Sequence, residues 1–292
     1  MRKKLNHWTA YDTVITIILL LIIVVTLYPM YYVLVASISD PGRLVSHLGP
    51  LFYPLGIDFS SYVLVFDNPM IGRGYLNTLL YLSIGTVVNV SLTILGAFVL
   101  SRKHLLWGRF LRFMVVFTMF FSGGMIPFYL TVDALGMTGN WLAVIIPYAV
   151  NPMNLIIMRT SFLSVPASLE ESASLDGASA MVILMRIVLP LSMPVVAVMI
   201  LFYGVGHWNS WFSAMMFSLP REELPLQMIL REILIMNSTE GMMTGISTAD
   251  KAPLTETVKY ATIMVATVPI LFVYPFLQRY FVKGVMIGAV KE

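Results

Sequence analysis

The 292-residue chain contains no cysteine, and only 11% of its residues are charged. Without cysteine, the chain has no disulfide, no thiolate nucleophile and no cysteine-ligated metal. A soluble domain carries about 25% charged residues, so 18 Lys and Arg with 15 Asp and Glu cannot cover a water-soluble protein of 32.7 kDa. With 58% hydrophobic residues and a mean hydropathy of +0.85, the composition excludes an ordinary soluble enzyme or a disordered chain and favours a multi-span membrane protein.

The motifs of several function classes are also missing. The four histidines stand alone and no H-E-x-x-H segment occurs, which argues against zinc, and no G-x-x-x-x-G-K-[ST] segment occurs, so ATP cannot bind through a P-loop. Ser122 has no paired histidine for catalysis within the membrane. The net charge of +3 is too small to indicate nucleic-acid binding. We therefore expect no catalytic residue, no metal and no cofactor in this chain, and its energy must come from a partner.

Six stretches are apolar enough, at about 20 residues each, to cross a bilayer as helices. We predict an all-α membrane protein with spans over residues 13–37, 76–100, 110–130, 141–162, 187–205 and 260–277. The first could be a signal peptide, but its apolar core is too long and no small-residue cleavage site follows it, so we interpret it as a retained helix. Prolines inside spans either kink helices, as in transport proteins, or only shape packing.

Basic residues predict the orientation of these spans. Twelve of the 18 Lys and Arg residues fall on the side that would hold both termini, and five fall on the other side. Lys and Arg are retained in cytoplasmic loops, so both termini are predicted to be cytoplasmic. The chain then divides into an N-terminus (1–12), a six-span transmembrane domain (13–278) and a C-terminal tail (279–292). Two long outer loops, 38–75 and 206–258, either contact a partner outside the membrane or only cap the bundle.

The inner loop between the fourth and fifth spans, residues 163–186, is more than a connector. Ser168 followed by Glu171 forms a capping-box pattern and predicts a helix start. Gly177 is expected to end that helix, because glycine adopts a left-handed conformation, and a return helix should run towards Arg186. Such a knob either seats in a partner's groove or lies on the membrane as an amphipathic connector.

The same loop resembles a known signature. Glu171-Ser172-Ala173, three residues, Gly177, nine residues and then Ile187-Val188-Leu189-Pro190 match the pattern E-A-A, x3, G, x9, I-x-L-P of ABC-importer permeases, with only Ser172 departing. On this and on the segments 121–127, 154–160, 208–211 and 274–288, the chain is similar to carbohydrate permeases of the maltose-importer type. More narrowly, it looks like the branch for oligosaccharides derived from polysaccharides, which includes alginate-type and other uronate importers.

The resemblance implies a type I ABC importer permease fold and a set of partners in a bacterial cytoplasmic (inner) membrane. These are a second permease, usually a different homologous chain, two ATPase subunits that hold the ATP and Mg²⁺, and an extracytoplasmic solute-binding protein that delivers the sugar. The loop 163–186, called the coupling loop from here on, would seat in a cleft of the ATPase. The contact residues implied by position are Glu171, Ser172, Ala173, Asp176 and Gly177.

Polar and aromatic residues inside spans are candidates for the substrate path, since amides bond sugar hydroxyls and aromatic faces stack on sugar rings. Intramembrane Asn also often bonds a neighbouring helix, for about 0.6 kcal/mol on average, and Trp often lies in the interfacial belt. Both readings stay open for Asn77 and for the main candidates, which are Asn89, Tyr148, Asn151, Asn154, Tyr203, Trp208 and Asn209.

The competing function class is an ion-coupled secondary carrier, or another transporter for a non-sugar solute. No Asp or Glu lies in the core of a predicted span, where an ion-coupled carrier would carry one. The inner-face knob also has no evident use in a carrier that works alone. The residues therefore favour the membrane subunit of an ATP-driven importer, and no motif encodes the identity of its sugar.

Overall fold

The computed structural model describes residues 9–103, 105–235 and 253–272, and these residues form helices and no strand. The chain divides into two compact units. One comprises residues 1–68 and 232–268, and the other comprises residues 69–231 and 269–292. The predicted N-terminus falls partly, and the C-terminal tail 279–292 wholly, outside the described residues.

The first unit begins with the long apolar helix α1 (Ala10–Ser37), which starts with a capping box between Thr9 and Asp12. Two short helices follow, α2 (Pro41–Ser46) and α3 (Ser60–Asp67). A small core of Val35, Ala36, Leu44 and Leu51 closes the loop after α1. The most apolar stretch of α1 has none of its residues buried, so this helix requires lipid or another protein around it.

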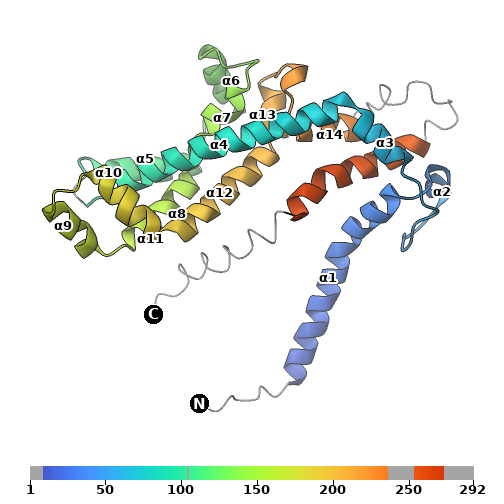
Figure 1. The fold of residues 1–292 in the computed structure, drawn as a ribbon, viewed down its shortest axis with the longest axis horizontal. Helices are drawn as coiled ribbons and strands as arrows, with labels where there is room; N and C mark the ends of the chain where they lie inside the picture. The colour runs from blue at the N-terminus through green and yellow to red at the C-terminus, as the bar shows by residue number, and fades with distance from the viewer. Residues whose placement is uncertain (1–8, 104, 236–252, 273–292) are drawn as a thin grey trace. The chain divides into compact units, whose positions relative to one another are not determined.

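The second unit is organised around α4 (Pro69–Ser101), which packs along α12 and α8 (Figure 1). Its core cluster is built from apolar residues of these three helices and of the segment 183–188. Helix α8 is Pro152–Leu163 and helix α12 is Met193–Trp208. The other helices of this unit are α5 (Gly108–Phe120), α6 (Met125–Ala134), α7 (Leu142–Ile145), η1 (Ile146–Tyr148), α9 (Ala167–Leu175), α10 (Ala180–Ile183), η2 (Leu184–Val188), α11 (Leu189–Leu191), α13 (Trp211–Met216) and η3 (Arg221–Glu223). Helix α14 (Leu226–Ile235) begins in this unit, and its residues 232–235 belong to the first unit.

Among the described residues, three helices are each long and apolar enough to cross a membrane: α1, α4 and the helix Pro253–Phe272. They contain the predicted first and second spans and most of the sixth, whose residues 273–277 lie outside the described residues. Three further spans are present within the described residues only if each of three bent helix pairs counts as one span. The all-α class is confirmed, and the number of spans stays a prediction.

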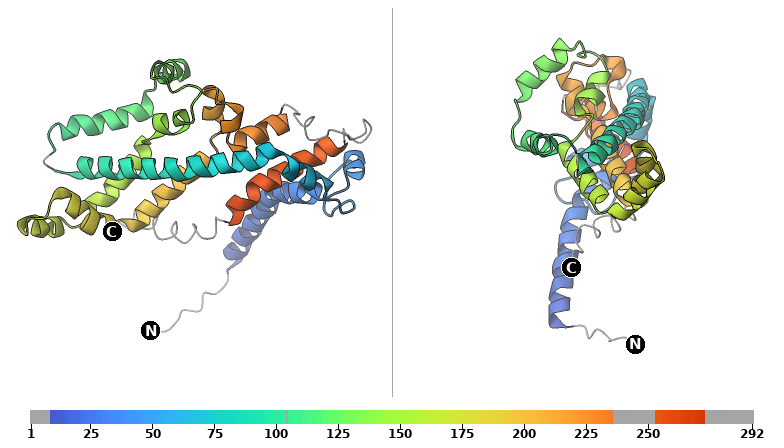
Figure 2. Two further views of the ribbon diagram at one scale, coloured as in Figure 1. Left: turned by 45° about the horizontal axis from the view of Figure 1, so that its top comes forward. Right: turned by 90° about the vertical axis from the view of Figure 1, so that its left-hand side faces the viewer.

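The third predicted span, residues 110–130, is wrong as a single helix. It consists of α5 and α6, which meet at 118° (Figure 2). The break falls at Ser122-Gly123-Gly124, where Gly124 has a φ of +86°. Gly124 stands directly before α6, and glycine adopts its backbone conformation, with a ψ of 172°, without strain. A helix cannot run through a residue in this conformation, so the apolar stretch 110–130 contains a break in the backbone.

The fourth and fifth predicted spans are also bent. The fourth bends by 50° between η1 and α8, next to Pro147 and Pro152, and the fifth by 86° at Ser192, between Pro190 and Pro194. Proline donates no backbone hydrogen bond and clashes with the preceding turn. Before the second bend, η2 is a π-helical segment, a geometry associated with interrupted helices. Thus the prolines do kink these segments.

Candidate functional site

The coupling loop forms a short helix that ends at the predicted bend. Helix α9 closes with the amide of Ala178 donating to the carbonyl of Ala173 at 2.9 Å and the amide of Gly177 donating to that of Ser174 at 3.1 Å. This pair of bonds is the Schellman arrangement, which needs a left-handed residue at the position of Gly177. Gly177 has a φ of +80°, so the predicted glycine bend is confirmed.

The predicted start of this helix is wrong. The residue before its first turn is Pro166, without a side-chain cap, and Ser168 lies inside the helix. Proline at 166 has a fixed φ and already sets the entry of the chain, so no serine cap forms there. The capping serine is instead Ser179, whose Oγ accepts from the amide of Val182 at 3.4 Å and starts the return helix α10.

The signature residues lie mainly on the outside of the loop. Glu171, Ser172, Asp176 and Gly177 are exposed, whereas Ala173 is half-buried and packs against the core cluster. Leu175, in the last turn of α9, is 90% exposed. Figure 1 shows α9 at one end of α4, beyond the packed helices. The loop therefore presents acidic, small and apolar groups outward while one small residue attaches it to the unit.

Arg102 and Glu170, neither of them among the predicted site residues, form an ion pair beneath this loop. Arg102 directly follows α4, and Glu170 is the neighbour of Glu171 on α9. Partial burial lowers the pKa of the Arg102 guanidinium. Both residues line a cleft of about 950 Å³ between the end of α4 and the segment 162–175. The sequence pattern that could have pointed to Glu170 is the pair of consecutive glutamates. Neighbouring residues on a helix point about 100° apart, so Glu170 and Glu171 cannot both make the same contact.

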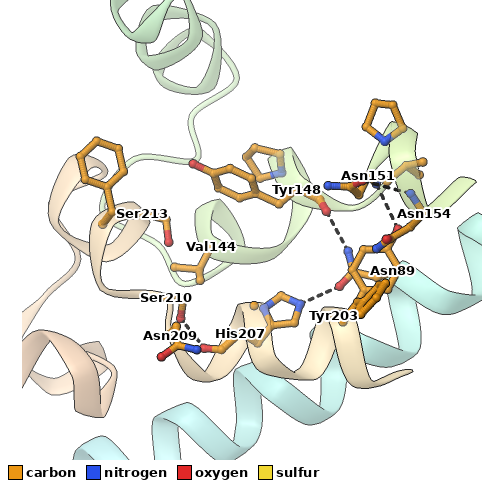
Figure 3. A pocket seen from close by; sticks show the side chains of 16 residues that line it. Asn89, Val144, Tyr148, Asn151, Asn154, Tyr203, His207, Asn209, Ser210 and Ser213 are labelled. Atoms are coloured by element: carbon orange, nitrogen blue, oxygen red, sulfur yellow. Dashed lines mark hydrogen bonds between the residues drawn. The ribbon is translucent and has the colours of Figure 1, made fainter. Parts of the chain in front are cut away.

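A polar cavity of about 470 Å³ lies elsewhere in this unit, between α4, the segment 144–154 and α12–α13. Apolar side chains such as Phe202 and Phe212 line part of it. Most of the polar groups around it come from the predicted substrate path. Six of the seven predicted residues line this one cavity, shown in Figure 3: Asn89, Tyr148, Asn151, Asn154, Tyr203 and Asn209.

Asn89 is the central hydrogen-bonding group of this cavity. Its amide nitrogen donates to the carbonyls of Tyr148 at 2.8 Å and Ala149 at 2.9 Å, and its Oδ1 lies 2.6 Å from Nε2 of His207 (Figure 3). The two carbonyls belong to the break between η1 and α8. Asn89 therefore satisfies backbone groups that the bend at Pro147 and Pro152 leaves outside a helix.

Tyr203 provides a second connection to the same bend. Its hydroxyl lies 2.7 Å from Oγ1 of Thr93 and accepts from the amide of Asn151 at 3.0 Å. The Asn151 side chain in turn caps α8 by accepting from the amides of Met153 and Asn154. Together these bonds join α4, α12 and the bend of the fourth segment through buried polar groups.

The cavity residues divide into two sets by exposure. Asn89, Asn154 and Tyr203 are buried, whereas Tyr148, Asn151 and Asn209 are exposed. Exposed amides and phenols can meet a solute, whereas the buried side chains of Asn89 and Tyr203 already bond neighbouring segments. The substrate-path prediction therefore applies best to the exposed set, and Asn89 and Tyr203 form a framework around it.

Two other aromatic and amide predictions fall outside the cavity lining. Trp208 is 7% exposed, does not line the cavity and packs edge-on against Tyr75 with ring centroids 6.3 Å apart. Asn77 donates to the carbonyls of Glu222 and Leu224 and so joins α4 to the η3 segment. Asn77 thus bonds a neighbouring segment, as in the alternative reading of intramembrane Asn, whereas Trp208 is buried and packs within the unit.

His207 also lines the cavity and is not among the predicted substrate-path residues, because no sequence pattern points to it. Its ring lies against α4 where Gly85 leaves space, since a Cβ at that position would overlap the ring. No cluster of three or more His, Cys, Asp or Glu suited to a metal occurs among the described residues. His207 is therefore part of the hydrogen-bonded framework around Asn89.

Comparison with known proteins gives the family. No family model matches the chain. The polygalacturonan/rhamnogalacturonan transport system permease protein YtcP of Bacillus subtilis (strain 168) is 39% identical over 282 residues, which cover 96% of this chain and 98% of that protein.

Two solved structures are also similar. A bacterial ABC transporter involved in the import of the acidic polysaccharide alginate has a chain that is 31% identical, with a TM-score of 0.85 over 96% of this chain and 100% of its own. A chain of the bacterial alginate ABC transporter in complex with alginate pentasaccharide-bound periplasmic protein is 17% identical, with a TM-score of 0.58 over 90% and 93%, and shows the fold alone. The identity to full-length permeases, with the matching fold, establishes that the chain belongs to the carbohydrate-transport permease family of ABC transporters.

Proposed function

We propose that this chain forms half of the translocation path of an ATP-driven importer for an oligosaccharide. The observation that carries the proposal is the Schellman bend at Gly177, which leaves Glu171, Ser172 and Asp176 exposed at the end of the unit. An ATPase that holds this bend can pull the coupling loop when it closes on ATP. The attached helices then swing, and the path opens to alternate sides.

The proposed cargo is an oligosaccharide from an acidic polysaccharide, such as a uronate oligomer. A relative is named for polygalacturonan and rhamnogalacturonan, and the similar solved transporter is named for the acidic polysaccharide alginate. The cavity supports a carbohydrate, because Asn151 and Asn209 offer amides to hydroxyl groups and the Tyr148 ring offers a face for stacking. A cavity rich in hydroxyl-binding groups and aromatic surface suits such a ligand.

The partners in this proposal are a second homologous permease, two ATPase subunits and an extracytoplasmic solute-binding protein. ATP and Mg²⁺ belong to the ATPases, and this chain contributes no catalytic group and no cofactor. The charge bias of the loops supports a multi-pass protein of a bacterial cytoplasmic membrane with both termini in the cytoplasm. The exposed apolar surface of α1 supports contact with lipid or with the second permease.

The test is ATP hydrolysis and uptake by the complete complex in proteoliposomes, with the binding protein present. Uronate oligosaccharides, neutral oligosaccharides and amino acids are supplied in turn, with ATP or with a proton gradient. We expect uronate oligosaccharides to stimulate ATP hydrolysis and to enter the vesicles only with ATP. Stimulation by amino acids would contradict the carbohydrate assignment, and uptake driven by the proton gradient alone would show an ion-coupled carrier instead.

A further inference from the structure

The Arg102 guanidinium is fixed to the end of α4 before it meets the coupling loop. Its Nε donates to the carbonyl of Phe98 and to Oγ of Ser101, each at 3.2 Å, and a terminal nitrogen donates to the same Oγ at 2.9 Å. The guanidinium carbon also lies 4.3 Å from the centre of the Phe98 ring, a cation–π distance. Four contacts to one helix end leave this long side chain little rotamer freedom.

Glu170 meets this fixed cation from a different part of the chain. The two residues are 68 positions apart in sequence. Their side chains are 31% and 17% exposed, so solvent screens the pair less than it screens a surface pair. The other ion pair in the described part of the chain joins Lys259 to Glu256, three residues away on one helix. Arg102–Glu170 is thus the long-range ion pair of the described residues, and it joins α9 to α4.

The coupling helix needs such an attachment. Helix α9 has nine residues, none buried, and no side-chain cap at its start. Its chain connections lead to α8 and to α10, but not to α4. A pull on the outward face of α9 would tilt or fray this helix unless its inward face were also attached. Glu170 and Ala173 provide the inward contacts, to Arg102 and to the core cluster.

Helix α4 connects this attachment to the cavity. Asn89 stands 12 residues before Ser101 on the same helix, a distance of about 18 Å along the helix axis. The inner end of α4 is also held by α8, because Nε of Arg159 donates to the carbonyl of Leu100 at 2.9 Å. Movement applied at Arg102 therefore reaches, through a rigid helix, the residue that holds the bend beside the cavity.

We infer that Arg102 and Glu170 are positioning residues that transmit movement of the coupling helix to α4 and, through it, to the substrate cavity. This inference rests on the proposed function. In this inference the exposed Glu171 is left to contact the ATPase, whereas its neighbour Glu170 bonds the permease itself through Arg102. Two consecutive glutamates on one short helix thus have different contacts: one with the ATPase and one with α4.

The test compares four variants in the complete reconstituted complex: Arg102→Ala, Glu170→Ala, the double variant, and Lys103→Ala as the control. Lys103 is the exposed cation next to Arg102 in the same cleft. The measurements are sugar taken up per ATP hydrolysed and the amount of ATPase that copurifies. For coupled residues we expect each single variant to lower uptake per ATP by about threefold to tenfold, and the double variant to be no worse than either single one.

We also expect the ATPase to copurify normally, and Lys103→Ala to behave as wild type. Conservative variants, Glu170→Gln and Arg102→Lys, are measured in parallel in case the alanine variants are unstable, and they should show a smaller loss. Unchanged uptake per ATP in the single variants, multiplying effects in the double variant, or loss of the ATPase from the complex would each overturn the inference. If wild type itself shows no sugar-dependent ATP hydrolysis, the proposed function fails instead.

Discussion

The coupling loop and the polar cavity belong to the same compact unit but are assembled from different kinds of contact. The bend of the loop depends on residues 173–178, which bond to one another within a single turn. The cavity is lined by residues from α4, the segment 144–154 and α12–α13. A local turn depends on the conformation open to one residue, whereas the cavity depends on hydrogen bonds between distant segments. Substitutions in the coupling loop should therefore lower transport per ATP, whereas substitutions in the cavity framework should lower the stability of the protein.

Gly177→Val should have the largest effect on transport and little effect on the packing of the helices. A β-branched residue at a φ of +80° is strained, although a Cβ there meets open space. We expect the bend to rearrange and sugar uptake per ATP to fall at least tenfold, a change of about 1.4 kcal/mol or more, within the cost of such strain. The measurement is uptake and ATP hydrolysis by the same proteoliposomes.

Gly177→Asn is the control for that variant, because asparagine tolerates the left-handed region. It should keep most of the coupling. Normal uptake by the valine variant would show that the bend is not needed for the transmission of movement. The glycine bend of the coupling loop would then have no role in transport.

Asn89→Leu should have the largest effect on stability. It leaves the carbonyls of Tyr148 and Ala149 and the ring of His207 without their partner. Each buried polar group left unsatisfied costs about 1–3 kcal/mol. We expect the apparent Tm of the detergent-solubilised complex to fall by several degrees. Asn209→Leu, on an exposed cavity residue, is the matched control and should leave the Tm within error; an equal fall in both variants would contradict the division into framework and exposed sets.

Gly85→Ala should destabilise the same framework by a different route. The added methyl group would overlap the His207 ring, and overpacking a filled site costs about 1–3 kcal/mol. The apparent Tm should fall, because the His207–Asn89 bond has to lengthen. Gly72→Ala, on the same helix with nothing near its Cβ, should be neutral or slightly stabilising. A Tm that does not distinguish the two variants would show that the packing of His207 against α4 is not tight.

Asn209→Ala should have the smallest effect and should appear only with the sugar. Its amide nitrogen donates to the carbonyl of Val205 at 2.8 Å, and the side chain is exposed on the cavity. Losing one hydrogen bond to a solute costs about 0.5–1.5 kcal/mol. We expect the sugar concentration for half-maximal ATP hydrolysis to rise a few-fold at unchanged Tm. An unchanged concentration dependence would remove Asn209 from the substrate path.

The coupling-loop bend could be predicted from sequence because its cause is local. Glycine at 177 after a short helical segment is sufficient to predict a left-handed end, and the structure has it. The capping-box prediction failed at Ser168, because Pro166 already sets the start of that helix. Hydropathy located the apolar stretches of the third, fourth and fifth predicted spans, but it measures composition and does not record a backbone break. Prolines were the signal for bends in the fourth and fifth, and the sequence left open whether they kink the helices or only shape packing.

The sequence by itself determined that the chain is a helical membrane protein with a glycine bend in its coupling loop, because composition and the conformational freedom of glycine act within one segment. Only the tertiary structure decided that Asn89 meets His207, 118 positions away, and that Glu170 forms an ion pair with Arg102 while Glu171, at the same cleft, stays exposed. These partners are chosen by how helices pack and where their bends fall. No local spacing records such a choice, because a hydrogen bond between two helices depends on the rotation and position of both.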